Sequence, residues 1–230
     1  LTAEALARPV AQMRTLPRCR GLFDLGQLSI LIGAPGEAER HLGASLDLAR
    51  ELNDAGRIAA TLQPLGMVHL ALGNLVEARR LIDEAVTLAQ SMADPRDVCA
   101  ALSTSAMLHR VEGHLEEAER LYTDVLAQAR ALDDRASIAI TQINLAMVAI
   151  SRGVTEGLAA RLAEARAIVA ELGSKTLGQS MLEVIAGLAS LRADWPRVAT
   201  LFGAAESVAR ETGLQRDPAD AHFLLPHVAA

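Results

Sequence analysis

The sequence predicts an all-α protein built from about five repeated helical hairpins. The first observation is a 40-residue period, because Gly33, Gly73, Gly113 and Gly153 are evenly spaced and Ala193 takes the next position. The second is composition: 51% of the residues are hydrophobic, yet the chain has only one Trp, one Tyr and three Phe. Since sheets are enriched in β-branched and aromatic residues, this aliphatic and alanine-rich composition favours packed helices.

A small–large–small pattern recurs after each of these turn positions. In the second unit it reads Ala78, Ile82 and Ala85, and a spacing of four and three residues places all three on one helical face. Each unit is therefore predicted to contain two helices, and the glycine closes the first of them because it tolerates a positive φ. The second turn of each unit carries capping residues such as Asp54 and Asp134.

The expected helices follow from these stops and starts. We expect the first helices of the units at 18–32, 57–72, 97–112, 136–152 and 175–192. We expect the second helices, whose first turns are mostly acidic, at 36–52, 75–92, 115–132, 156–172 and 195–211. Small residues in the first helices let the two helices of a hairpin approach closely, and they are Gly26, Gly66, Ala106, Ala146 and Ala186. Larger residues in the second helices fill the space around them, and they are Leu42, Ile82, Tyr122, Leu162 and Phe202.

The period divides the chain into three parts. Residues 18–212 form the five-unit array, and residues 1–17 are predicted to be a degraded half-unit or linker. Residues 213–230, where prolines interrupt the pattern, are predicted to fold back as a cap on the last hairpin. The chain begins at Leu1 without an initiator methionine, so we expect it to be a segment of a longer protein. Pro64 lies inside an expected helix and predicts a kink there.

One unit carries a family resemblance. Its order is Leu62, Leu65, Gly66, His69, Gly73, Ala78, Ile82 and Ala85. This order resembles the tetratricopeptide repeat, although the 40-residue period is longer than the usual repeat of about 34 residues. The resemblance implies a right-handed superhelical solenoid whose concave groove is lined by the first helix of each unit. The segment from Asp194 to Glu206 further resembles the closing repeat at the C-terminal end of large bacterial LuxR-type transcriptional regulators that contain an ATPase.

The resemblance also implies a set of groove residues in the first helices. Mapped onto this sequence, they are Arg20, Phe23, Gln27, Gln63, Met67, Leu70, Ser103, Met107, Arg110, Ile143, Met147, Ile150 and Glu183. Met67, Met107 and Met147 hold the same position in successive units. Flexible thioethers suit an adaptable binding surface, and packing between hairpins is the alternative role for these side chains.

No catalytic or metal site is expected from the sequence, and no cofactor. The segment from Gly173 to Thr176 lacks the glycine and the preceding strand of a phosphate-binding loop. His69 and His109 hold equivalent positions in neighbouring units, so repeat symmetry separates them by about 8–10 Å, and we expect both to pack within hairpins with locally bonded rings. Cys19 and Cys99 are two units apart and are expected to be free thiols.

Composition also limits the partners. The net charge of −6 argues against direct contact with nucleic acid by this segment. The longest uncharged stretch, Ile58 to Val76, contains Gln63, Pro64, His69 and Asn74, which argues against a membrane span. Two cysteines are too few for a disulfide scaffold and indicate a cytoplasmic location.

The sequence thus predicts a non-enzymatic binding module. The leading hypothesis is the sensor or interaction region of a bacterial transcriptional regulator, with a peptide, a partner protein or a small inducer bound in the concave groove. The alternative is a free-standing tetratricopeptide-repeat scaffold that mediates protein–protein interaction or associates with its own copies.

Overall fold

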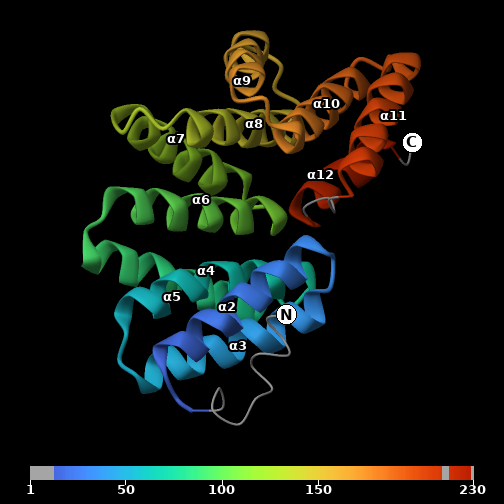
Figure 1. Ribbon diagram of the computed structural model, residues 1–230. Coiled ribbons are helices and arrows are strands. Elements are labelled where there is room, and N and C mark those ends of the chain that lie inside the picture. Colours follow the sequence, from blue (N-terminus) through green and yellow to red (C-terminus); the bar gives the residue numbers. More distant parts are fainter. Residues whose placement is uncertain (1–12, 214–217, 229–230) are drawn as a thin grey trace. The chain divides into compact units, whose positions relative to one another are not determined.

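The chain folds into α-helices joined by short turns (Figure 1). The computed structural model describes residues 13–213 and 218–228, and within them there is no β-strand. The first helices of the five hairpins are α2 (Leu16–Leu31), α4 (Ala55–Ala71), α6 (Pro95–Val111), α8 (Arg135–Ser151) and α10 (Lys175–Ser190). The second helices are α3 (Pro35–Glu51), α5 (Leu75–Met92), α7 (Leu115–Ala131), α9 (Leu158–Leu172) and α11 (Trp195–Thr212). A further helix, α12 (Pro218–Val228), follows the last hairpin.

The sequence-based helix boundaries are confirmed to within two residues at every end. The predicted N-terminal half-unit, 1–17, lies mostly outside the described residues. Its last two residues belong instead to α2, because the Thr15 side chain accepts a hydrogen bond from the Arg18 amide and Pro17 fits the first turn.

The turns within the hairpins have the backbone conformation that the glycine period predicts. Gly113 closes α6 with φ of +81°, and the non-glycine Ala193 adopts φ of +54° at the equivalent position after α10. Two of the turns between hairpins use Asp caps as expected, since Asp54 accepts from the Arg57 amide at 2.9 Å and Asp134 accepts from the Ser137 amide at 3.1 Å.

Close helix approach depends on the small residues of the first helices. A Cβ atom added to Gly26 would lie 2.5 Å from Cγ of Leu42, and one added to Gly66 would lie 2.8 Å from Cγ1 of Ile82. The same positions hold buried alanines in the later hairpins. The first two hairpins therefore close around a small residue that faces a large one, as the sequence predicts.

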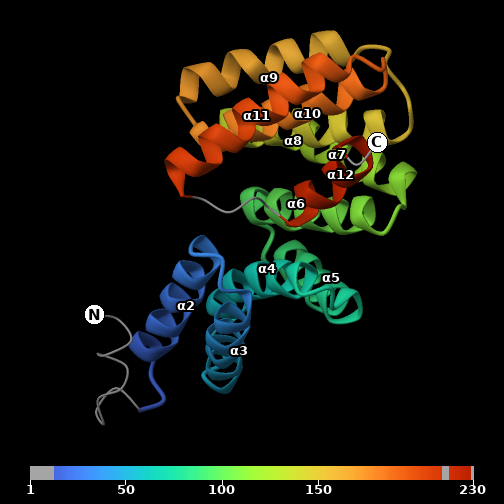
Figure 2. The same ribbon diagram turned by 90° about the vertical axis from the view of Figure 1, so that its right-hand side faces the viewer.

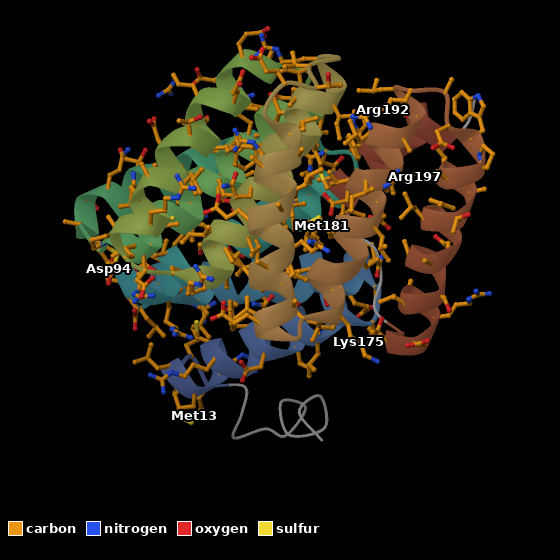
Figure 3. All side chains as sticks on the ribbon, turned by 90° about the horizontal axis from the view of Figure 1, so that it is seen from above. Met13, Asp94, Lys175, Met181, Arg192 and Arg197 are labelled. Carbon is orange, nitrogen blue, oxygen red and sulfur yellow. The ribbon has the colours of Figure 1, made fainter. Side chains whose placement is uncertain are left out.

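The chain divides into two compact units. The first, Leu1–Asp94, contains α2 to α5 and has an aliphatic core that includes Leu42 and Leu62. The second, Pro95–Ala230, contains α6 to α12 and has one cluster around Tyr122 and another around Met147. Within the second unit, the Met181 side chain lies among the helices while that of Lys175 is exposed at the rim (Figure 3).

Equivalent contacts recur two repeats apart. Cys19 Sγ lies 3.4 Å from the Ser45 carbonyl oxygen, and Cys99 Sγ lies 3.8 Å from the equivalent carbonyl oxygen, that of Val125. Both cysteines are buried free thiols, as predicted. Burial, and to a smaller extent the nearby Asp134 carboxylate, raises the pKa of the Cys99 thiol.

Two further sequence expectations concern single helices. Pro64 lies inside α4, which continues as one helix from Ala55 to Ala71. The kink expected at Pro64, a change in the direction of the helix axis, stays a prediction. None of the described helices combines the length and the apolar character that crossing a membrane requires.

Candidate binding site

The thirteen predicted groove residues all lie on first helices, and the two units expose them differently. In the first unit, Arg20 is exposed and only Leu70 is buried. The others there are half-buried, namely Phe23, Gln27, Gln63 and Met67. In the second unit five are buried, and they are Arg110, Ile143, Met147, Ile150 and Glu183. Ser103 and Met107 are half-buried.

Helix α12 covers one of these residues, Arg110, because it packs against α6 and α10 of the same unit (Figure 2). The Arg110 side chain on α6 is only 3% exposed. Its guanidinium donates to the Ala219 carbonyl oxygen at 3.1 Å and to Oδ1 of Asp220 at 3.2 Å. The Ser180 hydroxyl on α10 donates to the other carboxylate oxygen of Asp220 at 3.3 Å. One acidic side chain of α12 is thus held by two first helices.

Apolar side chains continue this contact along α12. Phe223 and Leu224 are 4% and 2% exposed and belong to one hydrophobic cluster with residues of α8 and α10. That cluster includes Ile143, Met147 and Ile150, three of the predicted groove residues. The tail that the sequence expects to cap the last hairpin therefore contains a helix that packs on the first-helix face, where the resemblance places the groove.

The three aligned methionines have separate environments. Met147 is fully buried in the cluster beside α12, and Met107 is half-buried against the cluster around Tyr122. Met67 is half-buried in the first unit. Met147 therefore has the packing role that was the alternative to binding, whereas Met67 and Met107 retain accessible surface.

Phe23 and its neighbours form the accessible part of the first-helix face in the first unit. The Arg57 guanidinium on α4 lies 5.9 Å from the centroid of the Phe23 ring on α2, within cation–π range. Phe23 also packs against the aliphatic core of this unit.

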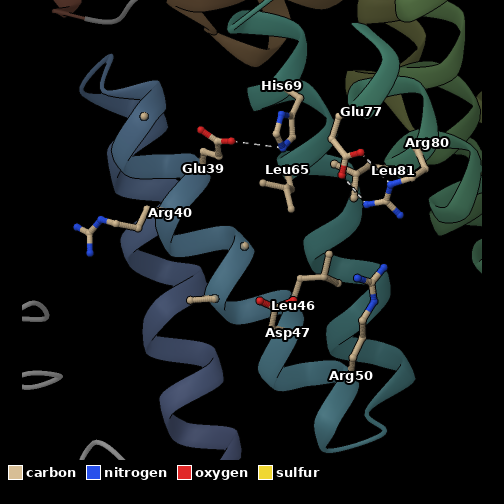
Figure 4. Close-up of a pocket in the computed structure, with 13 residues that line it drawn as sticks. Glu39, Arg40, Leu46, Asp47, Arg50, Leu65, His69, Glu77, Arg80 and Leu81 are labelled. Carbon is tan, nitrogen blue, oxygen red and sulfur yellow. Dashed lines mark hydrogen bonds and ion pairs between the residues drawn. The ribbon is translucent and has the colours of Figure 1, made fainter. Parts of the chain in front are cut away.

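A separate pocket of about 700 Å³ lies in the first unit between α3, α4 and α5 (Figure 4). It contains none of the predicted groove residues. Charged side chains surround it, and Nε2 of His69 faces Oε1 of Glu39 at 3.9 Å. No hydrogen-bond partner of His69 Nδ1 is found among the described residues, so the local bond that the sequence analysis expects of this ring is absent at that nitrogen.

Two of the arginines that line this pocket, Arg50 and Arg80, are already paired with glutamates. Arg80 donates to Glu77 at 2.6 Å and to Glu84 at 3.1 Å, and Arg50 donates to Glu84 at 2.7 Å. Hydrogen bonding from Arg80 lowers the pKa of Glu77 below its ordinary value. The lining holds three acidic side chains (Glu39, Asp47 and Glu77) and three arginines (Arg40, Arg50 and Arg80), and this balance of charge favours neither a cationic nor an anionic ligand.

One group of side chains has the composition of a metal site, and the sequence analysis did not identify it. The ligand atoms of His109, Glu112 and His114 all lie within 4.8 Å of one another at the turn between α6 and α7. The 40-residue period draws attention to His69 and His109 in neighbouring units and not to ligands within one turn. The signal that could have found this group is the short spacing His-x-x-Glu-x-His.

Comparison with known proteins supports the fold. No protein-family model matches the sequence, and neither does any curated protein. A solved Rap protein in complex with competence and sporulation factor has a TM-score of 0.74 at 13% identity, over 84% of this chain and 54% of the Rap chain. The chain thus spans about half the length of that Rap protein.

Two other solved structures are similar. The Rap conjugation gene regulator of plasmid pLS20, in complex with the Phr* peptide, has a TM-score of 0.70 at 12% identity, over 97% of this chain and 64% of that one. BtubC from P. vanneervenii has a TM-score of 0.64 at 18% identity, over 94% of this chain and 89% of the BtubC chain. At these identities the likeness shows the fold alone. The chain has the fold of a tetratricopeptide-like array of helical hairpins.

Proposed function

We propose that this chain is a non-enzymatic binding module that holds a short helical peptide, or a helix of a partner protein, on the face of its first helices. The observation that carries the proposal is the docking of α12 on α6 and α10. In that contact Arg110 binds Asp220, and Phe223 enters the apolar cluster. A short amphipathic helix laid on a groove is a recurrent mode of peptide recognition.

The chemistry of this contact indicates the class of peptide. Arg110 supplies a buried positive charge for a carboxylate, and Ser180 supplies a hydroxyl for the same group. The cluster around Met147 accepts aromatic and aliphatic side chains three and four residues further along the helix. A suitable partner therefore combines an acidic residue with a following apolar pair, as Asp220, Phe223 and Leu224 do. The Rap conjugation gene regulator of plasmid pLS20, solved in complex with the Phr* peptide, is consistent with this use of the fold.

The cellular context that we propose is the sensor region of a cytoplasmic bacterial transcriptional regulator. The resemblance of the segment from Asp194 to Glu206 to the closing repeat of such regulators supports it. Segments for an ATPase and for DNA binding, encoded next to this array in its gene, would support the regulator. A gene that lacks both would favour the free-standing scaffold instead.

Peptide binding is tested in the full chain with a fluorescent peptide that copies residues 218–228. In the Asp220→Ala variant the internal helix loses its ion pair, so the labelled peptide, which retains the aspartate, competes for Arg110. We expect fluorescence anisotropy to show binding to this variant at least about tenfold tighter than to the wild-type chain, because α12 occupies the wild-type face.

Two controls make the test specific. The Glu211→Gln variant, which alters an exposed ion pair of the same unit, is expected to bind the peptide as the wild type does. A peptide in which alanine replaces the aspartate is expected to bind the Asp220→Ala chain at least about tenfold more weakly than the aspartate peptide. Equal binding of the two peptides, or no binding of either, would contradict the proposal.

A further inference from the structure

The turn between α6 and α7 brings together three potential metal ligands. Helix α6 ends at Val111, and Gly113 adopts φ of +81°, which reverses the chain direction. The Gly113 amide donates to the Arg110 carbonyl oxygen at 3.1 Å, and the His114 amide donates to the His109 carbonyl oxygen at 2.9 Å. These two bonds form a helix-ending motif that holds residue 114 beside the last turn of the helix.

The side chains at this turn have the separations that a metal ion requires. Nδ1 of His114 lies 3.4 Å from Oε2 of Glu112. Two ligand atoms on a tetrahedral zinc ion, each about 2.1 Å from the metal, lie about 3.4 Å apart. The rings of His109 and His114 have centroids 5.7 Å apart and planes inclined at 53°, so they are not stacked face to face. All three ligand atoms fall within 4.8 Å of one another, and side-chain rotation would have to shorten the longer separations to about 3.4 Å when one ion binds.

The ligand types favour zinc over magnesium or calcium. Two imidazoles and one carboxylate suit a borderline metal, whereas magnesium and calcium prefer oxygen ligands alone. The Glu112 side chain is 15% exposed and the His114 side chain 62% exposed. The site therefore opens to solvent on one side, and three protein ligands leave the fourth tetrahedral position for a water molecule.

We propose that His109, Glu112 and His114 bind a zinc ion at the α6–α7 turn. The bound ion links the end of α6 to the start of the segment that leads into α7, so it also stabilises this hairpin. The site shares no ligand with the α12 contact, and it is independent of the proposed peptide binding.

The second repeat provides an internal comparison. His69 is equivalent to His109, and the Asn74 amide donates to the His69 carbonyl oxygen at 2.9 Å, as the His114 amide does in the third repeat. Leu72 and Asn74 replace the two other ligands there. The second and third units thus share this backbone turn, but the second unit has only the histidine and the third has all three proposed ligands.

Zinc binding is measured by titrating the full chain against a chromophoric zinc chelator. We expect the wild type to remove one zinc ion per chain from the chelator. His114→Asn, which copies the second repeat, is expected to weaken binding at least about tenfold, and Glu112→Leu to do the same. His69→Asn is the matched control and is expected to leave the affinity unchanged.

A second measurement separates loss of binding from loss of fold. His114 is exposed, so the helical circular dichroism of His114→Asn is expected to match that of the wild type. Addition of zinc is expected to raise the thermal stability of the wild type and of His69→Asn, but not that of His114→Asn. Wild-type protein that takes no zinc from the chelator would overturn the proposal. So would a His114→Asn variant that binds zinc as tightly as the wild type, or a His69→Asn variant that loses as much affinity.

Discussion

Asp220→Ala is expected to release α12 from the second unit without unfolding the hairpins. The side chains of Arg110 and Asp220 are 3% and 16% exposed, so the substitution leaves a guanidinium charge in a largely water-free contact. Removing one partner of a buried ion pair costs about 3–5 kcal/mol. We take the lower end, about 3 kcal/mol, because Asp220 retains some exposure and because α12 can detach and let Arg110 regain water.

Hydrogen exchange measures this loss directly. A loss of about 3 kcal/mol raises the exchange rate of amides protected by α12 docking by about a hundredfold. The increase is expected in residues 218–228, with little change in the amides of α7 and α9. Glu211→Gln is the matched control, because the Lys175–Glu211 pair is 67% and 62% exposed and such pairs contribute about 1 kcal/mol or less.

A double variant tests the physical reason. If the stranded Arg110 charge causes the loss, Arg110→Met combined with Asp220→Ala should restore much of the protection of α12, since replacement of a buried pair by apolar residues is often neutral. Unchanged exchange of residues 218–228 in Asp220→Ala would refute the reasoning, and so would an equal effect of Glu211→Gln.

Three further substitutions or measurements follow from local geometry. Gly26→Ala is expected to destabilise the first unit by about 1–3 kcal/mol in urea unfolding, because the new Cβ would lie 2.5 Å from Leu42, whereas Gly43→Ala, with no atom within 4 Å, should stabilise it by up to about 1 kcal/mol. Hydrogen bonds from the capped helix lower the pKa of Asp134, so this carboxylate contributes stability at neutral pH that is lost as the pH falls below about 3.9 and through the lowered pKa. Asp134→Ala should therefore cost about 1 kcal/mol at pH 7, and this difference from the wild type should shrink as the carboxyl protonates in acid. Because burial raises the pKa of Cys99, its alkylation by iodoacetamide at pH 8 should be at least about tenfold slower in the native chain than in the unfolded chain.

The parts of the fold that the sequence predicts are those encoded locally and repeatedly. Gly113 and its equivalents each mark a turn that needs positive φ, and the pairing of Gly66 with Ile82 places a small residue against a large one. Each of these residue patterns occurs in several units at the same position of the 40-residue period, so an atypical residue in one unit does not change the prediction. Helix ends are accordingly predicted to within two residues.

The docking of α12 was not predictable in the same way. Its residues lie outside the repeat period, and the bond between Arg110 and Asp220 joins positions 110 residues apart. No periodic pattern specifies a contact of that kind. The family resemblance implies that Arg110 and Met147 are groove positions, but it gives no sign that a helix of the same chain packs against Arg110 and the cluster around Met147.

The pocket of the first unit was missed for another reason. The resemblance directs attention to first helices, whereas this pocket is lined largely by the second helices α3 and α5. Its charged residues, such as Arg80 and Glu77, follow the ordinary pattern of i,i+3 ion pairs on an exposed helix. A sequence pattern typical of a solvated surface cannot distinguish a flat surface from a hollow one.

Residues that differ from their equivalents in the other units indicate function, whereas the repeated residues indicate only the fold. The residues equivalent to Arg110 in the other units are Ile30, Leu70, Ile150 and Ser190. A charge at a position that is otherwise apolar or small costs desolvation energy unless a partner compensates it, and here Asp220 does so. Glu112 and His114 depart from the second repeat at the same turn, where Leu72 and Asn74 are found. The third unit therefore concentrates both the buried charge that holds α12 and the proposed zinc ligands, although its backbone follows the common pattern.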